Sequence, residues 1–185
     1  MRTISFILAI ILFGFGFTTN KTKVKITNKS EVIIKGKSNV NSFSCKYNSD
    51  LIEDVFYIAV SKQNTKTTLI GAEILIKSNG FDCAHRMITK DFKTILKAED
   101  YPHIKIAVNE IVASNNALTA KVKVEIAGIA KDYIIPIVFD QKSNNVKGEL
   151  KLNIKDFKLK SPKKLLGMVV VDDNVDIQFN LFLQY

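Results

Sequence analysis

The strongest pattern in the chain is an alternation of apolar and polar residues with a period of two. In residues 175–184, apolar side chains occupy every odd position up to 183, and polar ones occupy 176, 178, 180 and 184. Successive side chains of a strand point to opposite faces, so one face of this run is dry and the other is wet. The same rhythm recurs in residues 104–108, 121–126 and 149–155. Half-buried strands of this kind are typical of an antiparallel sheet.

Two runs, residues 55–60 and 134–139, are apolar at both odd and even positions. A strand with two apolar faces needs cover on both, so the pattern predicts that something covers the outer face or that the run lies at a sheet overlap. Polar clusters at residues 115–116, 144–145 and 172–174 separate the runs. Their composition predicts turns between strands.

One segment has a helical period instead. Its apolar residues recur at i, i+4, i+7 and i+8 between charged side chains, which predicts a helix over about residues 84–98 with one apolar face. The helix is expected to end before Tyr101 and Pro102, because proline disfavours helical geometry in the residue before it. It would pack on the sheet or lie across one mouth of a barrel as a lid. The lid residues are Ile88, Phe92, Ile95 and Leu96.

The N-terminal segment predicts export. Met1 and Arg2 are followed by an uncharged apolar run from Ile4 to Phe17. This is typical of a cleaved signal peptide over residues 1–19, and an uncleaved anchor is the alternative. No cysteine follows the run to receive a lipid, so a periplasmic or secreted protein is expected rather than a lipoprotein. Residues 20–185 contain no repeat or linker and predict one domain. About eight strands with one helix could form a barrel or a sandwich.

The charge of the chain restricts its partners. The formal net charge of +9 comes almost wholly from lysine, because Arg2 and Arg86 are the only arginines. Arginine is the preferred side chain for reading phosphate and base edges, so specific nucleic-acid binding is not expected. A lysine-coated surface is compatible with weak contact with an anionic membrane surface or an anionic polymer.

Two cysteines, Cys45 and Cys83, predict a disulfide in an exported protein. The rival hypothesis is a metal site that adds His85 and His103, but the spacing matches no zinc module. No nucleophile motif surrounds either histidine, and the chain has no glycine-rich phosphate loop. The sequence therefore favours a protein that is not an enzyme and has no metal or cofactor.

Four stretches, in order along the chain, carry a resemblance to a known family. The first is residues 36–43 (GKSNVNSF), and the second runs from Cys83 through Met87 and Leu96 to residues 101–106 (YPHIKI). The third is residues 124–131 (VEIAGIAK). The fourth comprises residues 148–152 (GELKL), 156–159 (DFKL), Pro162, Gly167 and residues 175–179 (VDIQF). Together they resemble the YceI-like family of exported bacterial proteins, although Asn41, Phe43 and Ala130 stand where relatives have His, Trp and Thr.

The resemblance implies a single antiparallel lipocalin-like β-barrel that encloses the tail of a polyisoprenoid or another long-chain lipid. Apolar inward residues would surround the tail, and a few polar groups at a mouth would meet its head. An eight-stranded barrel is either filled by its own side chains or holds one small ligand. The alternative is therefore a filled barrel that acts through its lysine-rich surface on anionic envelope polymers. The sequence does not indicate the oligomeric state. The inward residues expected to line the ligand are Phe43, Ile106, Val108, Val124, Ile126, Phe139, Leu152, Phe157 and Phe179.

Overall fold

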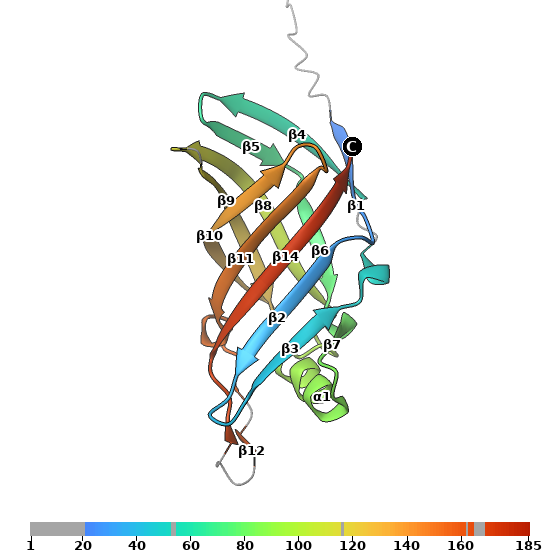
Figure 1. Cartoon of the computed structure of the whole chain (residues 1–185), viewed down its shortest axis with the longest axis vertical. Coiled ribbons are helices and arrows are strands. Elements are labelled where there is room, and N and C mark those ends of the chain that lie inside the picture. The colour runs from blue at the N-terminus through green and yellow to red at the C-terminus, as the bar shows by residue number, and fades with distance from the viewer. Residues whose placement is uncertain (1–20, 53–54, 116, 162, 165–168) are drawn as a thin grey trace, which may run out of the picture.

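The computed structural model describes residues 21–52, 55–115, 117–161, 163–164 and 169–185, which form an antiparallel β-barrel with one α-helix (Figure 1). The predicted signal peptide, Pro162 and Gly167 lie outside the described residues. The barrel strands are β1 (Thr22–Ile26), β2 (Glu31–Lys37), β3 (Ser42–Tyr47), β4 (Val55–Gln63), β5 (Lys66–Ile70), β6 (Glu73–Lys77), β7 (Phe81–Asp82), β8 (His103–Ser114), β9 (Ala117–Ile126), β10 (Ile129–Asp140), β11 (Asn145–Asn153) and β14 (Asn174–Gln184). The remaining elements are α1 (Arg86–Ile95), a small sheet of β12 (Lys163–Lys164) and β13 (Val169–Val170), and the 3-10 turns η1 (Ser49–Leu51), η2 (Ser78–Gly80) and η3 (Ile154–Phe157).

A ring of 8 strands closes the barrel in the order β1, β4, β5, β8, β9, β10, β11, β14 and back to β1. The closing contact pairs Ile26 with Leu183. Closure leaves no exposed strand edge in this ring, which removes the usual route to edge-to-edge aggregation. The predicted antiparallel barrel with one helix is therefore confirmed, and the alternative of an open sandwich is wrong.

The ring branches toward one end of the barrel. Beyond the end of β1, the long strand β14 pairs with β2. β2 in turn pairs with β3, and β3 pairs with β7. Beyond β5, the long strand β8 pairs with β6. The backbone N–H of Lys77 in β6 donates a hydrogen bond of 3.1 Å to the Tyr47 hydroxyl, which ties β6 to the end of β3. The two branches are thus joined through a side chain.

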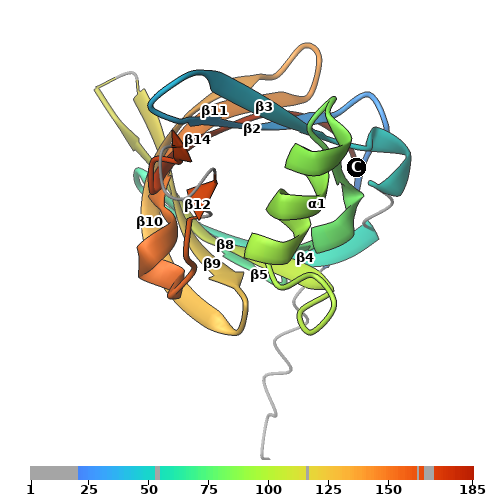
Figure 2. The same cartoon turned by 90° about the horizontal axis from the view of Figure 1, so that it is seen from below.

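The two ends of the barrel differ, and we name them by what they carry. The helix end carries α1, which lies across part of the mouth when the barrel is seen from below (Figure 2). The hairpin end carries the turns of the β4–β5, β8–β9 and β10–β11 hairpins and the C terminus (Figure 1). The predicted turns at Asn115 and Asn144 are confirmed, since both residues have positive φ angles of 46° and 49°. Asparagine tolerates this left-handed geometry better than most residues.

The helix is shorter than the sequence predicts. It runs from Arg86 to Ile95 instead of residues 84–98. His85 is the extended N-cap, and Lys97 has a φ of 51°, which is incompatible with a continued right-handed helix. The helix thus ends before Tyr101 and Pro102, and the left-handed residue ends it earlier than proline would. Among the described residues, no helix is long and apolar enough to cross a membrane.

The two doubly apolar runs lack the outer cover that the sequence predicts. Both lie in the closed ring, in β4 and β10, and their inner faces contribute to the core. Their outward residues Tyr57, Ile134 and Val138 are exposed, and no described residue covers them. The prediction of a covering element or sheet overlap is therefore wrong for the described part of the chain.

Candidate ligand-binding interior

The inner face of β14 is apolar over its whole length and only partly buried. Its inward residues are at odd positions, as the pairing of Ile177 with the buried Ile34 shows. Residues 176–180 pair with both β11 and β2, so Ile177 and Phe179 gain no exposure at a strand edge and should be fully covered if the core were filled. All five inward residues are half-buried instead, and at Ile177 and Phe179 this indicates unfilled space beside the side chain. The five are Val175, Ile177, Phe179, Leu181 and Leu183.

Two phenylalanine rings lie against the barrel wall over glycines of neighbouring strands. Phe179 faces Gly148 across β11 and β14, and Phe43 faces Gly36 across β2 and β3. A Cβ atom added to Gly36 would lie 2.3 Å from Cζ of Phe43, and one added to Gly148 would lie 2.4 Å from Cζ of Phe179. The absence of a side chain at each glycine lets the ring lie along the sheet. Both rings therefore leave more of the barrel axis free than upright rings would.

The other predicted lining residues on the long strands all face inward. Val124, Ile126 and Leu152 are buried in the apolar core. Ile106 pairs with Val124 and is only half-buried, as is its neighbour Val108. Half-buried inward residues thus lie on both β8 and β14, which are on opposite sides of the ring. Contact of any of these residues with a ligand stays a prediction.

Phe139 and Phe157 lie at opposite ends of the barrel. Phe139 is near the end of β10, pairs with Val146 and is 38% exposed at the hairpin end. Phe157 is in η3 at the helix end and is fully buried. Its ring stacks on Tyr133 with the centroids 6.4 Å apart. Phe157 therefore contributes to the floor of the interior, and Phe139 lies at its rim.

The Tyr133 hydroxyl is held in its neutral form at this floor. Burial raises the pKa of Tyr133 to about 12, and the nearby Asp156 carboxylate adds to the shift. The hydroxyl donates a hydrogen bond of 3.4 Å to Oδ2 of Asp156. An uncharged phenol with its polar atom directed to the surface is compatible with an apolar interior.

A pocket of about 550 Å³ opens at the hairpin end, beside the β8–β9 turn. Its lining combines the half-buried Leu118 with the hydroxyls of Thr65 and Ser114 and the amide of Asn115. The rim of the barrel is thus amphipathic at this end. A second pocket, of about 370 Å³, lies outside the barrel between η1, η2 and α1.

The helix end is packed by aromatic rings. Phe92 and Leu96 are buried in the core cluster, and Ile88 and Ile95 pack against it half-buried. The Phe92 ring meets Phe81 edge-on with the centroids 5.4 Å apart, and Phe81 meets Tyr47 in the same way at 5.1 Å. Edge-to-face pairs of this kind stabilise a core beyond their area alone. The predicted apolar face of the helix thus points into the barrel mouth.

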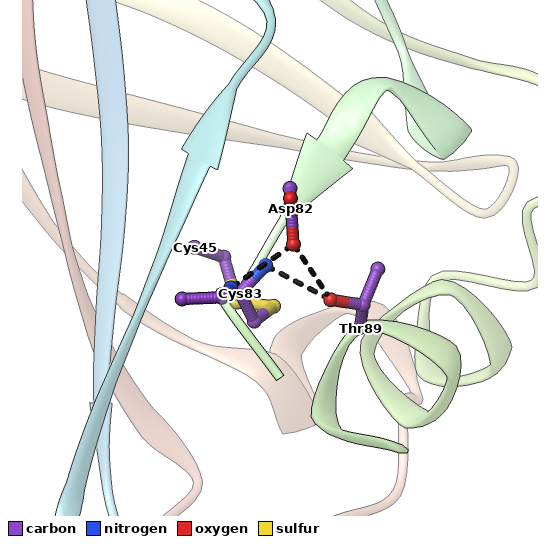
Figure 3. Close-up of a disulfide and its surroundings, with 5 residues drawn as sticks. Cys45, Asp82, Cys83 and Thr89 are labelled. Carbon is purple, nitrogen blue, oxygen red and sulfur yellow. Dashed lines mark hydrogen bonds between the residues drawn. A yellow bond between two sulfur atoms is a disulfide. The ribbon is translucent and has the colours of Figure 1, made fainter. Parts of the chain in front are cut away.

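The predicted disulfide joins Cys45 of β3 to Cys83, directly before the helix (Figure 3). Both cysteines are buried. Next to the bond, Oγ1 of Thr89 in α1 accepts a hydrogen bond of 3.0 Å from the Cys83 N–H and donates one of 3.1 Å to Oδ1 of Asp82. The disulfide and these two hydrogen bonds attach the first turns of α1 to the sheet.

Sequence reasoning did not identify Tyr47, Phe81 or the two glycines as parts of the interior. Tyr47 and Phe81 are nearly inaccessible, and their rings pack in a row with Phe92 at the helix end. The signal for the glycines was present, since Gly36 and Gly148 interrupt alternating strands, where glycine often marks a close approach. Their aromatic partners could only be identified from the strand register.

The two histidines stay apart from the interior. His85 and His103 are both exposed, and within the described ranges no group of three or more His, Cys, Asp or Glu side chains could hold a metal. Cys45 and Cys83 are used in the disulfide, so the rival metal hypothesis loses its two sulfur ligands.

Comparisons with known proteins agree with this architecture. The family described as YceI-like domain matches residues 17–183. The crystal structure of BcnA from Burkholderia cenocepacia superposes with a TM-score of 0.65 at 19% identity, covering 87% of this chain and 100% of that one. The YCEI protein of Campylobacter jejuni gives a TM-score of 0.44 at 14% identity, covering 68% of this chain and 80% of that one. No curated protein sequence matches significantly.

Proposed function

Because this chain belongs to the YceI-like domain family, we propose that it is an exported binding protein that holds a polyisoprenoid or another long-chain lipid inside its barrel. The observation that carries the proposal is the inner face of β14, where all five inward apolar side chains are only half-buried, including Ile177 and Phe179, which have paired strands on both sides. An apolar chain placed there would bury this surface, at a gain of roughly 25 cal/mol per Å².

In this proposal the ligand has a fixed direction. Its apolar tail points toward the helix end, where Phe81, Phe92 and Phe157 are buried. Its head lies at the hairpin end, where Thr65, Ser114 and Asn115 offer hydroxyl and amide groups. A few polar groups at the mouth of an apolar site are sufficient to orient such a ligand.

The helix acts as a lid whose hinge is restrained by the Cys45–Cys83 bond. Ligand exchange through the helix end requires Phe92 and Leu96 to leave the core, which is costly for large buried side chains. Exchange through the hairpin end requires no such step. We therefore propose that the ligand passes through the hairpin end and that α1 keeps the other end closed.

This role needs no catalytic group, and the proposal includes export to the periplasm or to the medium. The disulfide supports export, because such bonds persist in oxidising compartments.

The experiment is native mass spectrometry of the protein isolated from the cell envelope, followed by organic extraction and identification of the released molecule. The expected result is a mass increment that disappears on extraction and corresponds to a long-chain apolar compound. A mass equal to that of the chain alone, before and after incubation with isoprenoid and fatty-acid mixtures, would contradict the proposal.

A further inference from the structure

An exposed apolar patch lies on the outer surface of the barrel, across β4 and β5. Its residues are Val55, Tyr57 and Ile70, and we call them the β4 patch. Tyr57 and Ile70 are 56% and 62% exposed. Tyr57 points outward because Phe56, one position along, pairs with the buried Val24 of the inner face. Ile70 is on the same outer face because it pairs with Ala59, two positions from Tyr57. Large apolar side chains on the wet face of a sheet mark an interaction surface when they are clustered.

Lysines flank the β4 patch in register. Lys23 is the direct cross-strand partner of Tyr57, and Lys25 is the partner of Val55. Both lysines are exposed, and neither forms an ion pair with any of the described residues. Among the described residues, the patch therefore combines apolar side chains with positive charge that no carboxylate pairs, on a chain whose formal net charge is +9.

A second apolar stripe, on β10, has a different electrostatic setting. Ile134 and Val138 are 66% and 68% exposed, at least as much as the β4 patch. The lysine opposite Ile134, however, is Lys121, whose Nζ lies 2.8 Å from a carboxylate oxygen of Glu110. Lys147, the cross-strand partner of Val138, forms no ion pair with a described residue. One of the two lysines beside this stripe is therefore paired with a carboxylate, whereas neither lysine beside the β4 patch is.

We propose that the β4 patch, with Lys23 and Lys25, docks the barrel on a membrane surface that contains anionic lipid. Lysine side chains near such a surface are attracted to its headgroups, and tyrosine is favoured at the boundary between headgroups and acyl chains. Val55 and Ile70 would lie against the apolar boundary. This docking does not depend on what the barrel encloses, and it places a lipid carrier beside a source of lipid.

The test is co-sedimentation of the protein, isolated from the envelope, with vesicles of phosphatidylcholine alone or mixed equally with phosphatidylglycerol. Two double variants address the patch: Lys23→Gln with Lys25→Gln, and Tyr57→Ser with Ile70→Thr. The matched control is Ile134→Thr with Val138→Thr on β10. All six positions are exposed, so the fold should tolerate them, and circular dichroism and size-exclusion chromatography are run on each variant.

We expect binding to the anionic vesicles only. The lysine variant should lower the partition coefficient about 30-fold, since each lysine near an anionic surface contributes roughly fivefold. The tyrosine and isoleucine variant should also lose binding, and the β10 control should keep it. Equal binding to neutral vesicles, equal loss in the control, or a change of oligomeric state in the patch variants would overturn the proposal. The last result would assign the patch to contact between copies of the chain. A patch variant that no longer binds vesicles but still contains the enclosed ligand would show that docking is separate from lipid binding inside the barrel.

Discussion

The two ends of the barrel are built from strands with the same alternating pattern, yet only the helix end has a helix across part of its mouth (Figure 2). At the helix end, Tyr47, Phe81 and Phe92 form a chain of buried edge-on rings, and a disulfide fixes the segment before α1. At the hairpin end, Phe139 is 38% exposed and Leu118 is half-buried beside an open pocket. This difference shows that alternation along a strand decides which side chains face inward. The elements that cross a mouth of the barrel decide whether these side chains are covered.

The largest expected effect concerns the buried ring of the lid. Phe92→Ala should lower the free energy of unfolding by about 3 to 5 kcal/mol, because it removes a large side chain from a packed core. Phe139→Ala at the hairpin end should change it by less than about 0.5 kcal/mol, as expected for a surface position. Urea denaturation followed by circular dichroism measures both. Equal losses at the two ends would show that the ends are packed alike.

The lid function of α1 needs a separate comparison, since stability alone does not test it. Phe92→Ala should speed the loss of a bound apolar probe more than Phe179→Ala does when the two are compared at equal destabilisation. If the rate of probe loss depended only on the free energy of unfolding in both variants, α1 would contribute packing and would not act as a lid.

Removing the disulfide should have the next largest effect. The bond closes a loop between residues separated by 38 positions, and loss of such a bond typically costs about 2 to 4 kcal/mol. Cys45→Ala with Cys83→Ala should also increase hydrogen exchange in α1, and leave exchange in β10 and β11 unchanged. Unaltered exchange in α1 would mean that the helix is held by packing alone.

A smaller effect is expected from filling the space under a wall ring. Gly36→Ala should cost about 1 to 3 kcal/mol, since a methyl group at this position must displace the Phe43 ring. The displaced ring would move toward the barrel axis and lower the capacity for a bulky apolar probe. Gly36→Ala combined with Phe43→Ala removes the collision and should restore that capacity. If the double variant did not regain the capacity for the probe, the probe would occupy a space other than the one beside Phe43.

The smallest change concerns pH. Hydrogen bonds from Lys121 and then Lys66 lower the pKa of Glu110 below its usual 4.5. A carboxyl with a lowered pKa in the folded state stabilises it above pH 4.5, and this contribution is lost as the pH falls from there through the folded-state pKa. Glu110→Gln should therefore flatten the acid side of the stability profile measured by thermal denaturation. An identical acid slope in the variant would contradict this assignment.

The sequence predicts the strands and their inward faces well, because alternation depends only on local geometry. The Cys45–Cys83 bond was also predictable, since a chain with two cysteines has one intramolecular pairing. The end of the helix at Ile95 was not predictable, since the left-handed turn at Lys97 carries no glycine or asparagine signal.

How far side chains fill the barrel interior could not be predicted either. Whether Phe179 projects to the axis or lies along the wall depends on its partner being Gly148, and that pairing is known only from the strand register. In the same way, the exposed Ile134 and Val138 appear as candidates for a covered face until the topology leaves them outside. Both features depend on contacts between segments distant in sequence.

The most direct test of the central claim uses the absence of tryptophan from this chain. Phe179→Trp places a single fluorophore on the inner face of β14, and Phe182→Trp places one on the outer face of the same strand. Titration with a dibrominated long-chain fatty acid, whose bromines quench tryptophan at short range, should quench the fluorophore at position 179 in a saturable manner and leave the one at 182 unaffected. Equal quenching at both positions, or none at 179, would contradict a barrel that holds an apolar chain in its interior.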